Sequence, residues 1–527
     1  MKTGFWRQGE PFVWATGMAL ALVLSLTVML LYVVLANGLG VFWPKPVTLY
    51  ELTDGSLVMG EIHDREHPPG RDDWRYQIKT GNRDLDGLDF RWLTDEQIKS
   101  ASQPAEAMVL ERLEHGNFYG FLRDIRLPAD SHSDISLAAG LELTAPLHQE
   151  MARLGKLMAS RNNEIERARL KLAKLRHQGQ GDTPKAAILE GRKDQLKAEF
   201  EILVEQLNRQ RQELEGYRAL LVTADGREKE VALAEIVRWY QPNTMSFPAK
   251  SGYYLTRLKE LFLAEPRESN TEGGLFPAIF GTVMLTVLMS VFAFPVGVVA
   301  GIYLREYARQ GMLVKMVRIA VNNLAGIPSI VYGIFGLGFF VYGIGASIDQ
   351  IFFPERLPTP TFGTGGILWA SLTLALLTVP VVIVATEEAL GSIPPGIREG
   401  SQALAATKFQ TLTNLLLPMA SPGILTGFIL AMARAAGEVA PLMITGVVKL
   451  APALPLDGSF PYLHLDRKFM HLGFHIYDIG FQSPNVEAAK PMVYITTLLL
   501  ILLVLLLTST AIYLRNRMRK RYAVMDI

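Results

Sequence analysis

Several features are missing from this chain of 527 residues, and each absence excludes a class of site or function. Cysteine is absent, so no disulfide and no thiolate metal site can form. No Gly-x-x-x-x-Gly-Lys-Ser/Thr sequence occurs, so we expect no phosphate loop for ATP. The formal net charge is only +1, which gives no strong field for nucleic acid. The chain is nevertheless too long for one ordinary domain.

Charge is also missing from long stretches, and these stretches predict membrane-spanning helices. A span needs about 20 mostly apolar residues. Residues 12–36 fit one span, in a region without charge between Glu10 and Lys45. A cleaved signal peptide is the alternative, but this run is too long and has no clear cleavage site. Five further runs carry little or no charge: residues 273–304, 319–346, 357–386, 418–448 and 491–514. We therefore expect an all-α membrane protein with six spans.

The distribution of basic residues predicts the orientation, because cytoplasmic flanks are rich in Lys and Arg. Basic residues gather in the N-terminal tail, after the second span and in the C-terminal tail: Lys2, Arg7, Arg305, Arg309, Lys315, Arg318, Arg515, Arg517, Arg519, Lys520 and Arg521. With six spans these three places fall on one side. We expect both termini in the cytoplasm, and the long insert at residues 41–272 outside.

The insert contains two kinds of sequence pattern, and the first indicates β structure. Short apolar runs flank the turn sequences Thr53-Asp54-Gly55 and Asp225-Gly226. A further apolar run, residues 236–240, follows the second turn. These runs predict one small β domain that is interrupted by a long excursion.

The excursion, at about residues 143–221, has a heptad pattern. Its apolar positions are Leu147, Met151, Leu154, Met158, Ile165, Ala168, Leu172, Leu175, Leu196, Phe200, Leu203, Leu207, Leu214, Tyr217 and Leu221. Residues 179–182 break the pattern, and Thr183-Pro184 suits a new helix start. We expect an antiparallel coiled-coil hairpin. Two interpretations stay open: a rigid spacer, or a docking arm for a partner.

A charged pair inside the fifth span is the clearest candidate for a substrate pathway. A charge at mid-membrane costs at least ~2.5 kcal/mol and usually marks function. Arg434 and Glu438 are four residues apart, so they share one helix face and can pair. One interpretation is a structural ion pair that fixes helix packing. The other is a cationic station for an anionic substrate, with Glu438 positioning Arg434.

Helix-breaking and hydroxyl-bearing residues surround this pair. Gly437 and Pro441 flank Glu438, and residues 326–333 combine Gly and Pro with Ser329 and Tyr332. Such breakers are tolerated in a membrane where a cavity or a neighbouring helix satisfies the freed backbone groups. We therefore add the Ser329 and Tyr332 hydroxyls to the candidate pathway.

A polar loop at residues 387–418, between the fourth and fifth spans, carries a recognisable pattern. It reads Glu399-Gly400-Ser401, three residues, Ala405, nine residues, then Leu415 and Leu417-Pro418. This resembles the coupling loop of ABC-importer permeases, with Glu-Ala-Ala, Gly and Ile-x-Leu-Pro at these places. Gly400-Ser401 replaces Ala-Ala, and Ala405 stands where the pattern has Gly. Both departures exchange small residues for small residues.

Together with Gly274–Thr282, Gly326–Gly333, Glu387–Leu390 and Ala433–Pro441, the loop resembles the PstA-type permeases of bacterial phosphate ABC importers. The resemblance covers residues 274–527 well and residues 1–40 loosely, while the insert is typical of a longer variant. It implies the type I importer permease fold, with residues 1–40 holding the first span and 273–527 the core.

For function, the resemblance implies half of a phosphate pore in the bacterial inner membrane, with the insert in the periplasm. The implied partners are a second related permease, two ATPase subunits that bind ATP, and an extracytoplasmic phosphate-binding protein. The chain itself would have no catalytic residue and no cofactor. Arg434 would bind the anion, and Glu399 with its neighbours Gly400, Ser401, Ala405, Leu417 and Pro418 would transmit the movement of the ATPase subunits to the pore. The alternatives are another oxyanion, such as sulfate or molybdate, or a membrane sensor or assembly scaffold that acts through the hairpin.

Two further patterns are interpreted as features without a binding role. His471 and His475 have the spacing of zinc ligands on a helix, near His464, but no third ligand is well placed. We expect ordinary exposed loop histidines and no metal site. Residues 253–262 are amphipathic and lie ahead of the second span, which predicts an interfacial helix.

Overall fold

The structure is a computed structural model, and it describes residues 9–67, 73–128, 132–133, 135–458, 460–483 and 485–522. Its contacts divide the chain into two compact units. Unit 1 contains Met1–Val41, Leu261–Asp349 and Pro360–Ile527. Unit 2 contains Phe42–Glu260 and Gln350–Thr359. The insert expected at residues 41–272 thus ends earlier, at Glu260, and gains one short segment from the later chain.

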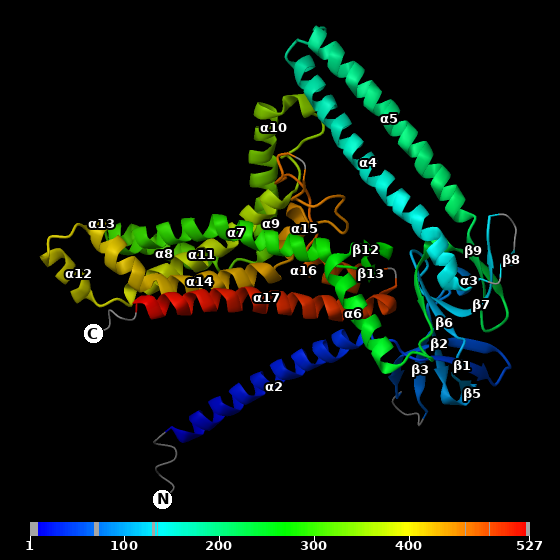
Figure 1. Cartoon of the computed structure of the whole chain (residues 1–527). Helices are drawn as coiled ribbons and strands as arrows, with labels where there is room; N and C mark the ends of the chain where they lie inside the picture. The colour runs from blue at the N-terminus through cyan, green and yellow to red at the C-terminus, as the bar shows by residue number, and fades with distance from the viewer. Residues whose placement is uncertain are drawn as a thin grey trace, which may run out of the picture. The chain divides into compact units, whose positions relative to one another are not determined.

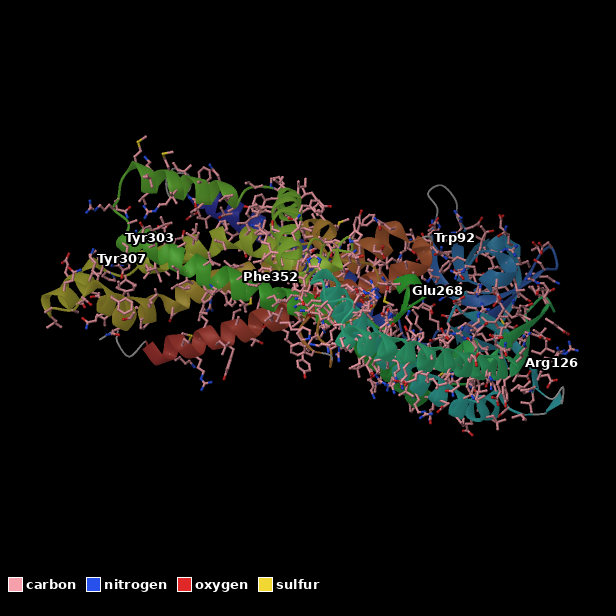
Figure 2. The ribbon with its side chains drawn as sticks, turned by 90° about the horizontal axis from the view of Figure 1, so that it is seen from above. Trp92, Arg126, Glu268, Tyr303, Tyr307 and Phe352 are labelled. Atoms are coloured by element: carbon pink, nitrogen blue, oxygen red, sulfur yellow. The ribbon has the colours of Figure 1, made fainter. Side chains whose placement is uncertain are left out.

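Unit 1 confirms the six expected spans. Six helical stretches in the described residues are long and apolar enough to cross a membrane: Glu10–Gly40, Phe276–Tyr307, Ser329–Phe352, Ile367–Gly391, Lys408–Gly437 and Val486–Met518. The first is helix α2 (Glu10–Gly40). The second joins α7 (Phe276–Ile302) to a π-helical turn, η4 (Tyr303–Tyr307). Figure 2 shows Tyr303 and Tyr307 together at that end of α7.

The third span begins later than the charge-free run from residue 319 suggested. A separate amphipathic helix, α8 (Met312–Leu324), includes the start of that run. The chain then turns through Gly326 and Pro328 before α9 (Ser329–Phe335), the π-helix η5 (Gly336–Gly345) and α10 (Ala346–Phe352). Pro328 cannot donate a backbone hydrogen bond, so the helix restarts there. A run without charge therefore overestimated the length of the span.

Helix α11 (Ile367–Gly391) forms the centre of unit 1. It is the most buried of the six spans, and it packs against α7 and α14 (Leu417–Gly437) (Figure 1). Glycines set the close approach of α7 to α11. A methyl group added at Gly297 would lie 2.6 Å from Val382, and one at Gly301 would lie 2.7 Å from Thr386. Small residues of this kind let membrane helices pack at short range.

The last helix, α17 (Val486–Tyr522), packs on α14 and meets α2. Short elements precede it: α15 (Ala440–Thr445), α16 (Leu472–Tyr477) and the π-helix η8 (Asp478–Gln482). Helix α2 touches α17 near its own end, where Gly38 faces Leu498. Most of α2 is exposed within this chain, so it has apolar surface for lipid or for another subunit.

Unit 2 contains two copies of one five-stranded module. The first has strands β1 (Val47–Leu52), β2 (Leu57–Glu66), β3 (Arg75–Lys79), β4 (Phe90–Thr94) and β5 (Ile98–Ser102). The second has β6 (Met108–Arg112), β7 (Phe118–Arg126), β9 (Arg218–Val222), β10 (Glu228–Ala232) and β11 (Ile236–Tyr240), with the short β8 (His132–Ser133) beside β7.

The two modules share their topology strand by strand. The antiparallel orders are β4-β3-β2-β1-β5 and β10-β9-β7-β6-β11. In each module a three-residue 3-10 helix joins the fourth strand to the fifth, η1 (Asp95–Gln97) in the first and η2 (Leu233–Glu235) in the second. The β part of the insert therefore lies in one compact unit, but it holds two sheets of the same strand order, which the sequence analysis did not predict.

The helical hairpin interrupts only the second module, between its second and third strands. It consists of α4 (Leu137–His177) and α5 (Pro184–Glu215), which pack lengthwise on each other. Heptad positions such as Leu154, Leu172 and Leu196 are buried between them. The hairpin ends before the expected Leu221, which lies in β9. In the first module the corresponding connection has only residues 67–74.

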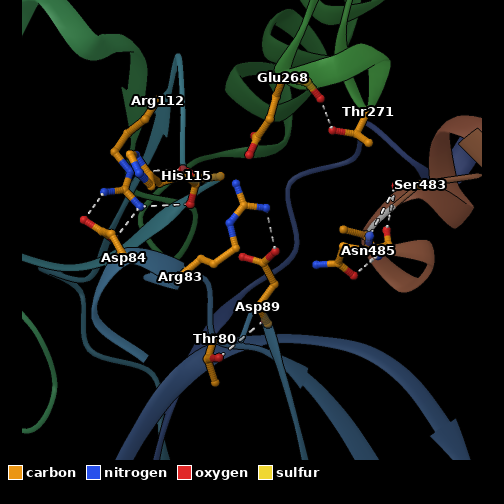
Figure 3. Close-up of polar contacts among 12 residues, drawn as sticks. Thr80, Arg83, Asp84, Asp89, Arg112, His115, Glu268, Thr271, Ser483 and Asn485 are labelled. Carbon is orange, nitrogen blue, oxygen red and sulfur yellow. Dashed lines mark hydrogen bonds and ion pairs between the residues drawn. The ribbon is translucent and has the colours of Figure 1, made fainter. Parts of the chain in front are cut away.

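A buried ion pair joins the two modules (Figure 3). Arg112 of β6 donates two 3.0 Å hydrogen bonds to Asp84, in the short helix α3 (Arg83–Asp86) of the first module. Arg112 is 2% exposed, and Lys229 also contacts Asp84 at 2.9 Å. Burial alone would raise the pKa of Asp84, but the hydrogen bonds from Arg112 and Lys229 outweigh it and hold that pKa well below its usual range.

The amphipathic stretch at residues 253–262 belongs to α6 (Phe247–Leu263), and charged contacts join this helix to the second module. The Tyr253 hydroxyl donates to Glu111 at 2.5 Å, and Arg257 pairs with the same carboxylate at 3.1 Å. Arg238 of β11 pairs with Glu260 at 2.7 Å. These polar side chains therefore face the second module, while Leu255 and Phe262 of the same helix stay exposed. The expectation of an interfacial helix stays a prediction.

Candidate functional site

The helix that carries Arg434 is broken directly after it. Helix α14 ends at Gly437, and Glu438 has an extended backbone with φ −77° and ψ 132°. The chain becomes helical again at α15, whose second residue is Pro441. The two charged residues therefore do not share one helix face, as the four-residue spacing suggested. Gly437 and Pro441, which the sequence analysis noted only as helix-breaking residues, flank this break.

Arg434 and Glu438 still pair, although loosely. Arg434 Nε lies 3.4 Å from Glu438 Oε1, which is long for a hydrogen bond between charged groups. Their side chains are 38% and 20% exposed. The other guanidinium nitrogens of Arg434 form no hydrogen bond with any described residue. A guanidinium has five N–H donors, so most of the donors of Arg434 are open to a ligand.

The two candidate hydroxyls stand in different situations. Ser329 is half-buried at the first position of α9. Tyr332 is 4% exposed, and its hydroxyl donates a 2.7 Å hydrogen bond to the Leu324 carbonyl at the end of α8. Helix α9 packs against α15, where a methyl group added at Gly333 would lie 2.8 Å from Pro441. Thus α9 lies beside the break in the Arg434 helix.

The loop at residues 387–418 folds as a helix, a turn and a helix. Helix α12 (Pro395–Ala403) holds Glu399, Gly400 and Ser401. After the turn come α13 (Lys408–Thr411) and the π-helix η7 (Leu412–Leu416), which lead into Leu417 and Pro418 at the start of α14. The Ser401 hydroxyl is buried and lies 2.9 Å from that of Thr411, so it joins the two arms. Glu399 and Gly400 are exposed.

Ala405 occupies the left-handed turn between the arms, with φ +59°. Its N–H donates to the Gln402 carbonyl at 2.9 Å, and the Ala406 N–H donates to the Ser401 carbonyl at 3.2 Å. These two bonds define a Schellman motif, whose left-handed residue is usually glycine. The turn geometry thus explains why the family pattern has Gly where this chain has Ala405.

The tip of the loop carries two exposed apolar side chains that the sequence analysis did not single out. Leu404 is 86% exposed and Phe409 is 66% exposed. Together with Glu399, whose carboxylate has no hydrogen bond or ion pair within the described chain, they form a surface that this chain leaves uncovered. We call these three residues the docking surface. Exposed apolar side chains at the tip of a polar loop are a signal for protein contact.

Two ion pairs behind the docking surface were also missed. Arg398 of α12 pairs with Glu306 of η4 at 2.8 Å, and Arg318 of α8 pairs with Glu387 of α11 at 2.9 Å. An open cleft of about 390 Å³ lies beside the second pair; its lining residues are Arg305, Arg318, Glu387, Glu388, Gly391 and Ser392. The sequence analysis used Arg318 only as a positive-inside flank and Glu387 only for the resemblance, because pairing across 69 or more residues has no local signal.

The histidines of the loop before α17 are not exposed, contrary to expectation. His471 is 0% exposed and His475 is 2% exposed. Burial lowers the pKa of each to about 4, because the charged form loses its hydration. His471 Nδ1 accepts a hydrogen bond from the Gly473 N–H, so this side chain caps α16. Among the described residues, no group of three His, Asp or Glu side chains could hold a metal ion.

Comparisons with known proteins place this arrangement in a family. Residues 293–520 match the family described as "Binding-protein-dependent transport system inner membrane component". The probable ABC transporter permease YqgI of Bacillus subtilis is 30% identical over 223 residues, which are 41% of this chain and 70% of that protein. The probable phosphate transport system permease PstA of Methanocaldococcus jannaschii is 34% identical over 221 residues, covering 41% and 67% of the two chains.

The phosphate transport system permease PstA of Yersinia pestis is 37% identical over 182 residues, 34% of this chain and 56% of that protein. The chain thus spans between about half and about two thirds of the length of the curated relatives it matches. Among solved structures, the inward facing MetNI methionine ABC transporter aligns at a TM-score of 0.35, with 20% identity over 46% of this chain and 95% of that chain. That likeness is too low to support an argument. The sequence matches and the six apolar helices show that the chain belongs to the family of ABC transporter permeases described as binding-protein-dependent transport system inner membrane components, and that it is of the PstA type.

Proposed function

We propose that this chain is the transmembrane permease subunit of an ATP-driven phosphate importer in a bacterial inner membrane. It forms half of the translocation pore, and a second related permease forms the other half. Two ATPase subunits bind ATP and drive the cycle, and an extracytoplasmic binding protein delivers phosphate. The relatives named as phosphate permeases support the substrate, and the helix–turn–helix at residues 395–416 supports the ATPase partner.

The observation that carries the proposal is the open guanidinium of Arg434. A positive charge within a membrane span is costly and needs a reason. A purely structural pair would use its donors well, whereas Arg434 makes one 3.4 Å contact and stays 38% exposed. Phosphate is a small anion with several acceptor oxygens, and a guanidinium fork binds such groups through two parallel hydrogen bonds. Ser329, in α9 beside the break, adds a hydroxyl donor to the proposed pathway.

The orientation follows from the charge of the flanks. The docking surface lies in the same unit as the basic residues Arg305, Arg309 and Lys315, which are typical of a cytoplasmic face. In this orientation both termini are cytoplasmic and the duplicated β modules are periplasmic. The paired helices α4 and α5, with their heptad leucines, act there as a coiled-coil hairpin.

Uptake of radiolabelled phosphate tests the function. Cells that lack this chain are rescued with the wild type or with Glu399→Lys, and sulfate and molybdate are added as competitors. We expect rescue by the wild type, little rescue by the variant because its docking surface has the opposite charge, and competition by unlabelled phosphate alone. Competition by sulfate or molybdate would move the proposal to another oxyanion.

A second role, as a sensor or assembly scaffold, is favoured by one observation. The hairpin interrupts a β module whose twin is complete without it, so the fold of the module does not require the hairpin. Replacing residues 157–203 by a short turn removes the distal hairpin and keeps its packed base. Loss of a phosphate-dependent signalling response with normal uptake would support this role, whereas normal signalling would reject it.

A further inference from the structure

Arg398 forms four hydrogen bonds within unit 1. It lies on α12, one residue before the exposed Glu399. Its guanidinium contacts Glu306 at 2.8 and 3.4 Å, the Ile393 carbonyl at 2.9 Å and the Leu390 carbonyl at 2.7 Å. The Arg398 and Glu306 side chains are 21% and 16% exposed, so the contact is largely shielded from water.

The acceptors come from two different helices. Glu306 belongs to η4, which continues α7, and the Leu390 carbonyl belongs to the last turn of α11. Carbonyls in the last turn of a helix lack the i+4 donors of a continuing helix, and a cation near them is favourable. The Leu390 carbonyl also accepts a 3.4 Å hydrogen bond from the Ile393 N–H, so Arg398 adds a second, charged donor there. The planar fork of arginine presents donors in several fixed directions and so reaches a carboxylate and two carbonyls together, whereas the ammonium of lysine would have to meet all three at one point.

The two helices that Arg398 joins already form one rigid pair. The glycine contacts at Gly297 and Gly301 hold α7 against α11. Arg318 adds a second connection at the same end, since it donates to Glu387 of α11 at 2.9 Å and to the Leu304 carbonyl of η4 at 3.2 Å. A side chain that binds both helices therefore fastens α12 to a block that extends through unit 1.

We propose that Arg398 is a positioning residue that fastens α12 to the α7–α11 pair, so that a push on the docking surface moves both helices as one body. The inference rests on the proposed function, because it needs an ATPase that pushes α12. Arg398 itself touches neither ATP nor substrate. On α12, Arg398 lies on the side that contacts α7 and α11, while the neighbouring Glu399 faces the ATPase.

The absence of cysteine from this chain makes the displacement measurable, since introduced cysteines are the only sites on this chain that react with thiol-directed spin labels. We would label Gln402→Cys on α12 and Tyr303→Cys on η4, both exposed, in the assembled complex. Distances between the labels are then measured by pulsed electron resonance with and without ATP. Arg398→Gln is compared with Lys408→Gln, which removes an exposed cation of α13 that has no partner among the described residues.

We expect the distance distribution to be the same with and without ATP in the unmutated background and in Lys408→Gln. In Arg398→Gln and in Arg398→Lys the distribution should broaden or shift when ATP is added. In the same complexes, uptake per ATP hydrolysed should fall about tenfold with Arg398→Gln, because charge-assisted hydrogen bonds are lost. Glu306→Gln, which keeps both carbonyl contacts, should give a smaller change and serves if the Arg398 variants do not fold.

Two results would overturn the inference: an ATP-dependent change of distance in the unmutated background, or an unchanged distribution in all Arg398 and Glu306 variants. Both results come from the distance measurement, which does not depend on the anion that the complex transports. Absence of phosphate uptake in the wild type, with the distances as expected, would reject the proposed substrate and leave the positioning role in place.

Discussion

The left-handed Ala405 yields a prediction that can be worked out in numbers. Ala405→Gly exchanges the one residue of the α12 turn whose φ is +59°, at an exposed site where no side-chain packing is lost. A residue with a Cβ costs about 1–2 kcal/mol in the left-handed region. Glycine adds about 0.4–1 kcal/mol of unfolded-state entropy, which opposes the gain. The net expectation is stabilisation of the turn by about 0.5–1 kcal/mol.

Amide hydrogen exchange measures this local stability directly. The amides to follow are those of Leu404, Ala405 and Ala406, which all donate hydrogen bonds to carbonyls of α12. Their exchange in the assembled transporter should slow about two- to fivefold in Ala405→Gly. The matched control is Ala403→Gly, two residues earlier inside the helix, where glycine costs about 1 kcal/mol and exchange should become faster.

The two alanines are close together in the sequence and lie in the same loop, so only backbone conformation separates the expected signs. Faster exchange in both variants would refute the reasoning, because it would show that the Ala405 site does not favour glycine. Equal exchange in wild type and Ala405→Gly would mean that the strain only equals the opposing entropy of about 0.4–1 kcal/mol, below the range expected for a left-handed alanine.

Other parts of the chain give three shorter predictions. Arg112→Met should destabilise the paired β modules by about 3–5 kcal/mol, since it leaves the Asp84 carboxylate buried beside only one cation; loss of protection against limited proteolysis in the insert measures it. For His471 and His475 the folded pKa lies below the ordinary value near 6.5, so their stability contribution is complete above pH 6.5 and declines towards pH 4. Between pH 8 and pH 5 the free energy of unfolding should therefore fall by on the order of 2 kcal/mol per histidine, which lowers the thermal midpoint. The decrease should be smaller in His475→Gln. Gly301→Val should prevent assembly, because its side chain would overlap α11, and a native gel would show the loss.

The membrane half of the fold could be predicted because its signals are local. A span needs only its own apolar residues, and six were expected and found. The loop pattern located α12. The break beside Glu438 was not predicted, although Gly437 and Pro441 had been noted as helix-breaking residues. The start of the third span was misplaced because freedom from charge does not distinguish the end of an amphipathic helix such as α8 from a membrane span.

The insert was harder because its pairing is long-range. The turns at Gly55 and Gly226 were correctly located, and both glycines have positive φ. The duplication was missed because β7 and β9 pair across the whole hairpin, and no periodicity marks such a contact. The same reason hid the Arg398–Glu306 pair, whose partners are 92 residues apart. Burial of His471 and His475 likewise depends on neighbours that the sequence does not show.

One measurement tests the central claim most directly: ATP-driven uptake of radiolabelled phosphate by the assembled transporter in vesicles, with wild type, Arg434→Ala and Arg434→Lys compared at equal amounts of protein. The account predicts that Arg434→Ala loses about tenfold or more of the uptake, since an anion in the membrane loses its charged donor, and that lysine restores part of it as a point charge. Uptake by Arg434→Ala at the wild-type rate would contradict the account and remove this guanidinium from the pathway.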